Sequence, residues 1–468
     1  KGRILVTTNY DGLFLLDGTK FTKFKTEADK FLVESQLYNS CITAEGNFAF
    51  ATQRGGVALV DRNGKLLRII NEKSGFPTNV TYDVFSDKQG GLWLSTVLGL
   101  AYCEVPSPFT LFKDAGYLKN LSSAVIRFNG RIYVGNEFGV LYYNNKTSSF
   151  QLLKDSNRPA YGFLDAGGAL FAATNWGVVR IDNEKISKPI LDNSSNVLIS
   201  SNVYPNRVYA PQDRGLSVIQ KQNNKLTLVD YEQIAAEEIL QMVEESDGSL
   251  WLAGFFPGII HVTKNLKELP QKLEADIDYK YYKSSDGLPG SSWQIFNIQN
   301  IMILATDKGV FRFDKKSKSF VADSTLGTIF MDSTAAISNI ETNYNGDLWI
   351  LAKVNDVDVF GIAKHQSNRK YNWKPDPVFN RLNLSTIHAI YSDYYQGKEV
   401  LWLSTEEALI RYDPAIKKQI NNKYQTLIRK VVLDNDSIIF SGFRIPEIDV
   451  KKVILPFAKK NIRFVVSS

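Results

Sequence analysis

The sequence lacks most features that mark a catalytic, metal-binding or membrane-spanning chain. It has 2 cysteines, 3 histidines and 3 methionines among 468 residues. No run of 18 or more apolar residues occurs, so nothing in it reads as a membrane-spanning helix. A glycine-rich phosphate loop, a His-Glu-x-x-His motif and a Cys-x-x-Cys motif are all missing. We therefore expect no catalytic residues, no cofactor and no metal, and we read the acidic segments 356–358 and 434–436 as solvated turns.

An excess of one charge sign is also lacking. Lys and Arg number 55 against 49 Asp and Glu, a net charge of +6, and the basic residues are scattered singly. Because nucleic-acid binding needs clustered positive charge, we expect no nucleic-acid partner. Cys41 and Cys103 lie in stretches that read as strand. We interpret them as small buried residues and leave a disulfide between them open.

The feature that the sequence does contain is a repeated hairpin, clearest at 90–102. An apolar strand with Trp93 runs to a short turn that ends in Gly99, and a second alternating strand follows. Aligned on that glycine, ten copies follow one another at separations of 38 to about 52 residues; the ninth is degenerate and Ala408 replaces the glycine in the tenth. This period, without helical periodicity, is typical of propeller blades. Further copies with Trp lie at 248–254, 345–352 and 400–410.

The strands around each hairpin predict an all-β chain of four-stranded blades. Pro106 and Pro108 cannot both sit in a central strand, so we place a domain joint there. We predict three blades of an N-terminal, truncated propeller over 1–105 and a β-propeller of about seven blades over 106–416. One continuous ten-unit ring is the alternative. The repeat stops after Pro414, and 417–468 reads as the beginning of a β-sandwich, so we expect the chain to be cut from a longer protein.

Some of these residues resemble a known family. The pattern Asp-x-x-Gly-x-Leu-Trp at 87–100, and more loosely at 247–259, resembles the two-component regulator propeller repeat. Segment 285–292 resembles the family's Asp-Gly-Leu-Pro-Ser-Asn loop, and 74–79 is a second copy with Phe for Leu. Leu455-Pro456-Phe457, followed by the strand from Asn461, resembles the start of a three-Tyr sandwich domain.

The resemblance implies the sensor region of a bacterial membrane signalling protein. Such a region is periplasmic, is anchored to the inner membrane in the full-length protein, and often forms a homodimer. Its membrane tether and its kinase or other output domain would lie outside this chain. The copies between 130 and 220 depart from the pattern because they lack the Leu-Trp pair, which leaves the number of blades open.

Candidate ligand-binding residues come from positions that differ between blades. Trp93, Trp251, Trp349 and Trp402 share one register, which indicates packing between blades. One position of the first strand varies instead, and in a propeller these side chains would converge near the axis. They suit a carbohydrate or another polar organic ligand, whereas the alternative is a channel filled with water and packing aromatics. The position holds Tyr82, Ala124, Tyr161, Gln241, Trp293, Ser338 and His388, and Trp176 and Arg214 in hairpin turns are further candidates.

We therefore expect a binding module rather than an enzyme. Its partner would be an extracellular ligand, with an oligosaccharide as one option, and the signal would pass through the C-terminal sandwich. The first alternative is a propeller scaffold or protein-interaction component of the cell envelope. The second is a polysaccharide lyase or glycosidase, which needs a converging pair of carboxylates or a His or Tyr base with an Arg on one face.

Overall fold

The computed structural model describes most of the chain as β-strand. The described residues are 3–87, 90–113, 118, 122–145, 147, 149–182, 184–212, 214–222, 225–234, 237–263, 278–416, 427–434, 437–441 and 461–467. Contacts divide the chain into two compact units, Lys1–Ile416 and Lys417–Ser468, and each is described by itself. The predicted all-β fold class is confirmed. Among the described residues, no helix has the length and apolar character needed to cross a membrane.

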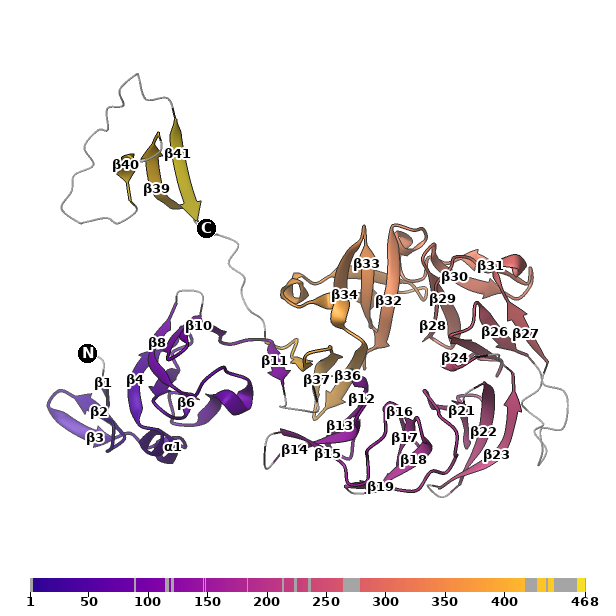
Figure 1. Cartoon of the computed structure of the whole chain (residues 1–468), viewed down its shortest axis with the longest axis horizontal. Helices are drawn as coiled ribbons and strands as arrows, with labels where there is room; N and C mark the ends of the chain where they lie inside the picture. Colours follow the sequence, from indigo (N-terminus) through magenta and orange to yellow (C-terminus); the bar gives the residue numbers. More distant parts are fainter. Residues whose placement is uncertain are drawn as a thin grey trace. The chain divides into compact units, whose positions relative to one another are not determined.

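Among the residues that the structure describes between Phe109 and Tyr412, seven four-stranded antiparallel sheets form a ring (Figure 1). The first strands contact one another between the first and second, the fourth and fifth, and the sixth and last sheets, and the first strand of the first sheet also contacts that of the last. In the first six sheets the four strands are consecutive in sequence. These are β12 (Ser122–Phe128), β13 (Arg131–Asn136), β14 (Gly139–Asn144) and β15 (Ser149–Leu152); β16 (Ala160–Asp165), β17 (Leu170–Thr174), β18 (Gly177–Asp182) and β19 (Lys185–Ile186); β20 (Ile199–Ser200), β21 (Arg207–Gln212), β22 (Gly215–Gln222) and β23 (Lys225–Gln233); β24 (Ile239–Glu244), β25 (Leu250–Gly254), β26 (Ile259–Val262) and β27 (Tyr279–Tyr282); β28 (Trp293–Ile298), β29 (Ile301–Thr306), β30 (Gly309–Asp314) and β31 (Ser319–Ala322); and β32 (Ala335–Thr342), β33 (Leu348–Val354), β34 (Val357–His365) and β35 (Tyr371–Pro375).

The last sheet includes one strand from the beginning of the ring's sequence. It consists of β36 (Ala389–Tyr395), β37 (Lys398–Ser404) and β38 (Leu409–Tyr412), and β11 (Phe109–Phe112) pairs with β38 as its outermost strand. Phe109 lies opposite Tyr412, and Phe112 lies opposite Leu409. The prolines Pro106 and Pro108 precede β11 and lie outside every strand, as the sequence predicts. The ring is therefore closed, because its first and last segments in sequence pair within one sheet.

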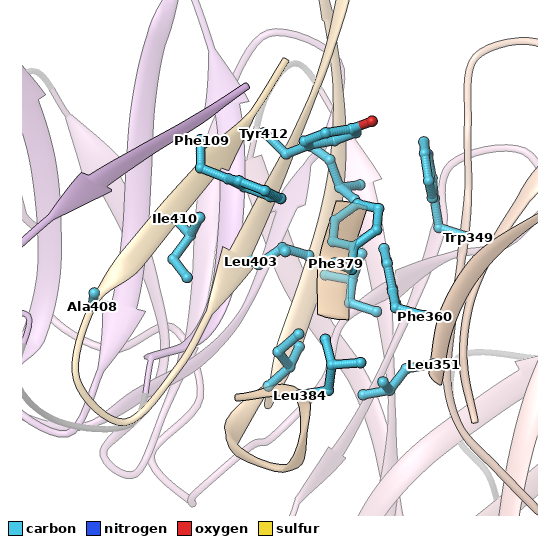
Figure 2. Packing of buried hydrophobic residues seen from close by; sticks show 13 residues of the cluster. Phe109, Trp349, Leu351, Phe360, Phe379, Leu384, Leu403, Ala408, Ile410 and Tyr412 are labelled. Carbon is cyan, nitrogen blue, oxygen red and sulfur yellow. The ribbon is translucent and has the colours of Figure 1, made fainter. Parts of the chain in front are cut away.

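Buried side chains between neighbouring sheets form the core of the ring. Figure 2 shows the cluster between the sixth sheet and the last sheet. The rings of Phe360 and Phe379 meet at a centroid distance of 4.4 Å, and those of Phe379 and Tyr412 at 4.7 Å. Phe379 belongs to η5 (Pro377–Arg381), a short 3-10 helix that, with η6 (Leu384–Thr386), connects the two sheets. Phe109 joins the same cluster, so the closing strand is held by packing as well as by pairing.

A threonine and a glycine close the repeated hairpin turn. The hydroxyl of Thr174 donates to the carbonyl of Gly177 at 2.7 Å and accepts from the backbone N–H of Trp176 at 3.1 Å. Gly177 has φ +122°, and an added Cβ there would collide with the carbonyl oxygen of Leu191. Only glycine fits a left-handed position that a neighbouring loop also covers. The same hydroxyl bond to the turn glycine recurs at Thr8, Thr52, Thr96 and Thr306, and in the last sheet Thr405 donates to Ala408, which replaces the glycine.

The four aligned tryptophans do not share one environment. Trp251, Trp349 and Trp402 are 0%, 4% and 4% exposed, which confirms the prediction that they pack between blades. The prediction is wrong for Trp93, which is 44% exposed. Its sheet lies outside the ring, and no further described sheet covers that face. Exposure at this position therefore reports whether a neighbouring sheet is present.

Three sheets precede the ring within the same unit (Figure 1). Cys41 and Cys103 are free thiols packed against one cluster there, and burial raises the pKa of both. The joint predicted between residues 105 and 106 stays a prediction, because contacts place both sides in one unit. The sheets are β1 (Ile4–Thr7), β2 (Leu13–Asp17) and β3 (Lys20–Lys23); β4 (Leu37–Ile42), β5 (Phe48–Thr52), β6 (Gly56–Val60) and β7 (Leu66–Ile70); and β8 (Thr81–Ser86), β9 (Gly91–Thr96) and β10 (Gly99–Glu104), with α1 (Asp29–Glu34) and the 3-10 helix η1 (Glu72–Ser74) between strands.

The second unit contains one described three-stranded sheet. Its order is β40 (Ser437–Phe440), β39 (Leu427–Leu433) and β41 (Ile462–Ser467). These strands lie where the sequence predicts strands, but a sandwich of the three-Tyr type stays a prediction. The segment Leu455-Pro456-Phe457 lies outside the described residues, as do residues 435 and 436 of the predicted turn.

Candidate functional site

The first strands and the hairpin turns meet at one end of the ring. In the second sheet, Ala160 at the start of β16 pairs with Thr174 at the end of β17, beside the turn at 175–176. The start of the first strand likewise pairs with the end of the second strand in β24 with β25 and in β28 with β29. We call this end the hairpin-turn face: the starts of the first strands of the ring together with the turns between second and third strands. Tyr161, Gln241, Trp293, His388, Trp176 and Arg214, six of the predicted ligand residues, lie on it.

The predicted residues are not equivalent to one another, because several first strands contain a β-bulge. The register shifts by one residue between Ala160 and Gly162 and between Ile337 and Asn339, which leaves Tyr161 and Ser338 unpaired. In β12 and β24 the unpaired residues are Ser123 and Leu240, so Ala124 and Gln241 lie one position further along. Trp293 and His388 lie one position earlier, in strands without this shift. A bulge inserts one extra residue into one strand, and the separations between turn glycines already vary by more than one residue, so alignment on the glycine misses it.

Three predicted residues already have structural partners. The side-chain oxygen of Gln241 accepts from the backbone N–H of Ile295 at 3.0 Å, which links the fourth and fifth sheets. The indole N–H of Trp293 donates to the carbonyl of Pro289 at 2.8 Å, and its ring packs on the cluster between these sheets. His388 Nε2 lies 3.6 Å from Glu406 Oε1, an ion pair only when the histidine is protonated.

Tyr161, Trp176 and Arg214 remain open to solvent to different degrees. Trp176 is 41% exposed and Arg214 is exposed. Tyr161 is partly buried, and this burial, with the nearby Glu238 carboxylate as a smaller cause, raises the pKa of its phenol. Glu238 itself accepts from the side-chain amide of Asn196 at 2.9 Å. An exposed indole can stack on an apolar ligand face, and amide and carboxylate groups on the same face of the protein can hydrogen-bond the polar edge of the ligand.

Two exposed aromatic residues on this face were missed by sequence reasoning. Phe138 is 36% exposed in the turn between β13 and β14, and Phe255 is 66% exposed in the turn after β25. Phe138 occupies the position of Trp176, immediately before the turn glycine. Aligning the residues that precede the turn glycines would therefore have identified Phe138 as a candidate. The first, second and fourth sheets therefore each present an aromatic side chain, whereas the last sheet presents Glu406 and Glu407.

Hydrogen bonds fix the adjoining loop in the fifth sheet. Asp307, in the turn between β29 and β30, accepts from the backbone N–H of Ser291 at 2.7 Å and from its hydroxyl at 3.0 Å. These bonds hold the pKa of Asp307 below its usual value, and the bond from the backbone N–H has the larger effect. The turn and the loop before β28 therefore stay together on the hairpin-turn face.

Tyr82 does not belong to this face. It lies at the bulge of β8, in the three sheets before the ring, where the shift falls between Thr81 and Asp83. Its ring contacts that of Tyr38, the bulge residue of β4, at a centroid distance of 5.9 Å. Within the part of the chain that the structure describes, no group of three or more His, Cys, Asp or Glu side chains is placed to hold a metal ion.

Comparison with solved structures shows the same fold in two extracellular domains. The chain is similar to the extracellular domain of BT3049 from B. thetaiotaomicron, which is classed as a hybrid two-component system, with TM-score 0.61 and 16% identity over 97% of this chain and 60% of that one. It is also similar to the extracellular domain of BT4673 from the same bacterium, classed likewise, with TM-score 0.50 and 11% identity over 91% and 59% of the two chains. This chain thus spans about 60% of the length of these neighbours. No protein-family model and no curated protein sequence matches it.

Proposed function

We propose that this chain is the ligand-binding part of an extracytoplasmic sensor and that its hairpin-turn face binds a carbohydrate. The observation that carries the proposal is the row of exposed aromatic side chains on turns of one closed ring: Phe138, Trp176 and Phe255. Aromatic faces stack on the apolar faces of sugar rings, and Tyr161, Asn196 and Arg214 supply hydrogen-bonding groups at the same end of the ring. The fold shared with extracellular domains of two-component systems supports an extracytoplasmic position.

Signal transfer is part of the same proposal. A bound ligand changes the output of a sensor only when it has different affinity for two arrangements of the protein. The unit Lys417–Ser468 follows the ring directly in sequence and is the segment through which a change would pass to a membrane tether and an output domain.

Calorimetric titration of the whole chain with a panel of neutral and acidic oligosaccharides tests the proposal. We expect saturable binding of at least one class. Replacing one stacking aromatic, Trp176→Ala or Phe255→Ala, should weaken that binding by about fivefold to tenfold. The matched control is Tyr344→Ala, which removes an aromatic residue that is 67% exposed in the turn between β32 and β33, at the opposite end of the ring.

Two results would overturn the proposal. One is the absence of binding by every oligosaccharide class in the panel. The other is binding that Tyr344→Ala weakens and the two substitutions on the hairpin-turn face leave unchanged. Far-UV circular dichroism of each variant checks that the sheets remain folded.

A further inference from the structure

A cavity lies in the seam where the ring closes. Its volume is about 260 Å³, and its walls come from the first sheet on one side and the last sheet on the other. A cavity of about 150 Å³ in another protein binds benzene, so this one has room for a compact organic molecule. Among its lining residues, Gly130 lies in the turn between β12 and β13 and Arg131 begins β13, so the cavity lies toward the end of the ring opposite the hairpin-turn face.

Three arginines line this cavity: Arg127, Arg131 and Arg411. Each has an acidic partner behind it. Arg127 forms a two-point contact with Asp393, Nε to Oδ1 at 2.8 Å and Nη2 to Oδ2 at 2.7 Å. Arg131 Nη1 lies 3.3 Å from Glu184, and Arg411 Nη2 lies 3.1 Å from Asp413. None of these three carboxylates is among the described lining residues, so the lining carries guanidinium groups and no acid.

The guanidinium groups keep unused donors. Arg127 also donates through Nη1 to the carbonyl of Gly130 at 2.7 Å, so this residue is fixed in place. An arginine has five N–H groups, and the contact with Asp413 occupies one of those on Arg411. Side chains of Arg131 and Arg411 are 38% and 30% exposed, so ligand access needs no rearrangement of the core.

Three aromatic side chains also line the cavity, and Gly130, Ile132 and Asn145 complete the described lining. Phe112, Tyr143 and Trp402 line the cavity together with the arginines. The ring of Phe112 lies 5.8 Å from that of Tyr143 and 5.6 Å from that of Trp402, centroid to centroid. Phe112 belongs to the closing strand β11, Tyr143 to the first sheet and Trp402 to the last sheet. A flat apolar body fits such walls, and paired N–H groups fit the two oxygens of a carboxylate.

We propose that the seam cavity binds a small organic carboxylate with a flat body. The carboxylate is held by Arg131 and Arg411, and Arg127 with its Asp393 partner forms the fixed floor. This site is independent of the proposed carbohydrate site, because it lies at the other end of the ring and uses other residues. A ligand here bridges the first sheet, the last sheet and β11, and it therefore stabilises ring closure.

Thermal unfolding of the whole chain with benzoate as the probe tests this proposal. Benzyl alcohol serves as the uncharged counterpart and inorganic phosphate as the anion without a flat body. We expect benzoate at about 10 mM to raise the unfolding temperature in a concentration-dependent way, since a ligand that binds only the folded state stabilises it by mass action. Benzyl alcohol and phosphate should each have a much smaller effect.

Substitutions assign the effect to the cavity. Arg131→Gln and Arg411→Gln should each weaken benzoate binding at least tenfold, measured by calorimetry. Arg411→Lys, which keeps the charge but loses the planar fork, should weaken it nearly as much. The control is Arg312→Gln, because Arg312 also pairs with a carboxylate, Asp323 at 3.2 Å, but lies on β30 away from the seam.

Several outcomes would overturn the proposal. These are no shift with benzoate, an equal shift with benzyl alcohol, a shift with phosphate that matches benzoate, or loss of binding in Arg312→Gln alone. Arg131 and Arg411 are partly exposed, so their variants should fold, and their unliganded unfolding curves check this. Failure with benzoate leaves the oligosaccharide titration unaffected, so the two proposals fail separately.

Discussion

The ring and the three sheets that precede it are built from one repeat, but they complete it differently. The ring has seven described four-stranded sheets, and β11, from the beginning of its sequence, completes the last sheet. Before the ring, the sheets of β1–β3 and of β8–β10 each have three described strands. Trp402 and Trp93 occupy the same position of the repeat, yet they are 4% and 44% exposed.

Some features of the repeat form within a single sheet, whereas others require a neighbouring sheet of the ring. The hydroxyl bond that caps the hairpin turn is present in both regions, at Thr174 and at Thr96, so it depends on the repeat alone. Burial of the tryptophan depends on a neighbouring sheet. Phe85, Trp93 and Leu100 are 63%, 44% and 77% exposed on β8, β9 and β10. The same sequence pattern therefore contributes much more stability inside the ring than outside it.

Substituting one tryptophan in each region gives the largest expected difference. Trp251→Ala should lower the free energy of unfolding by about 3–5 kcal/mol, because it leaves a cavity in a fully buried cluster. Trp93→Ala should cost about 1 kcal/mol, since much of that side chain already contacts water. Denaturant unfolding of both variants measures the difference. Equal losses would mean that the face bearing Trp93 is covered in solution.

Removing one charge at the seam tests how strongly closure holds the ring. Asp393 is 1% exposed, pairs with Arg127 across the seam, and accepts from the indole N–H of Trp402 at 3.0 Å. Asp393→Asn keeps the volume but leaves Arg127 without a countercharge, so we expect a loss of about 3 kcal/mol. The surface pair Arg180–Asp182 is the control, and Asp182→Asn should cost less than about 0.5 kcal/mol.

The same denaturant experiment measures both seam variants. A loss in Asp393→Asn no larger than that in Asp182→Asn would contradict the view that the seam pair matters for closure. The three earlier sheets offer no equivalent control among their described residues, because their inter-sheet contact between Asn39 and Asp83 is exposed.

Sequence reasoning predicted the repeated elements better than the contacts between distant segments. The hairpins, the packing of three tryptophans and the all-β class follow from local patterns of glycine, threonine and apolar residues. The role of β11 does not, because a four-residue strand pairs with a partner about 300 residues away and no local pattern specifies that pairing. The seam cavity was not predicted for the same reason, since Arg127 and Arg411 are far apart in sequence and meet only when the ring closes.

The candidate ligand face was predicted only in part for a related reason. Trp176 and Arg214 were placed correctly on hairpin turns. Phe138 and Phe255 were not predicted, because turn residues lack the period-two alternation by which a strand sequence indicates exposed and buried positions. A one-residue bulge changes which side chain points where without altering spacing between glycines, so Tyr161 and Gln241 appeared equivalent although their registers differ.

A contact between first strands should make ring stability depend on pH, with the smallest of the three expected effects. In the three earlier sheets Asn39 donates to Asp83 at 2.6 Å in an exposed position. In the ring, Glu341 on β32 is partly buried and accepts from the backbone N–H of Ser392 on β36 at 3.0 Å. Burial raises the pKa of Glu341 from 4.5 to about 7, and the Ser392 bond opposes this only in part. Nearby titratable groups on the neighbouring sheet are Tyr391, Asp393 and Glu399.

The sign of the pH effect follows from the raised pKa. Below pH 4.5 the carboxyl is protonated in both states, and between pH 4.5 and about 7 the unfolded chain loses the proton while the folded ring keeps it. Stability from this group is therefore lost as pH rises through that window. Glu341→Gln should match the parent at pH 4 and exceed it by about 1–3 kcal/mol at pH 8. In denaturant unfolding, Gln241→Ala removes an inter-sheet bond without removing an ionisable group, so its difference from the parent should stay constant with pH. A Glu341→Gln difference that is equally constant would show that this carboxyl ionises alike in the folded and unfolded chains.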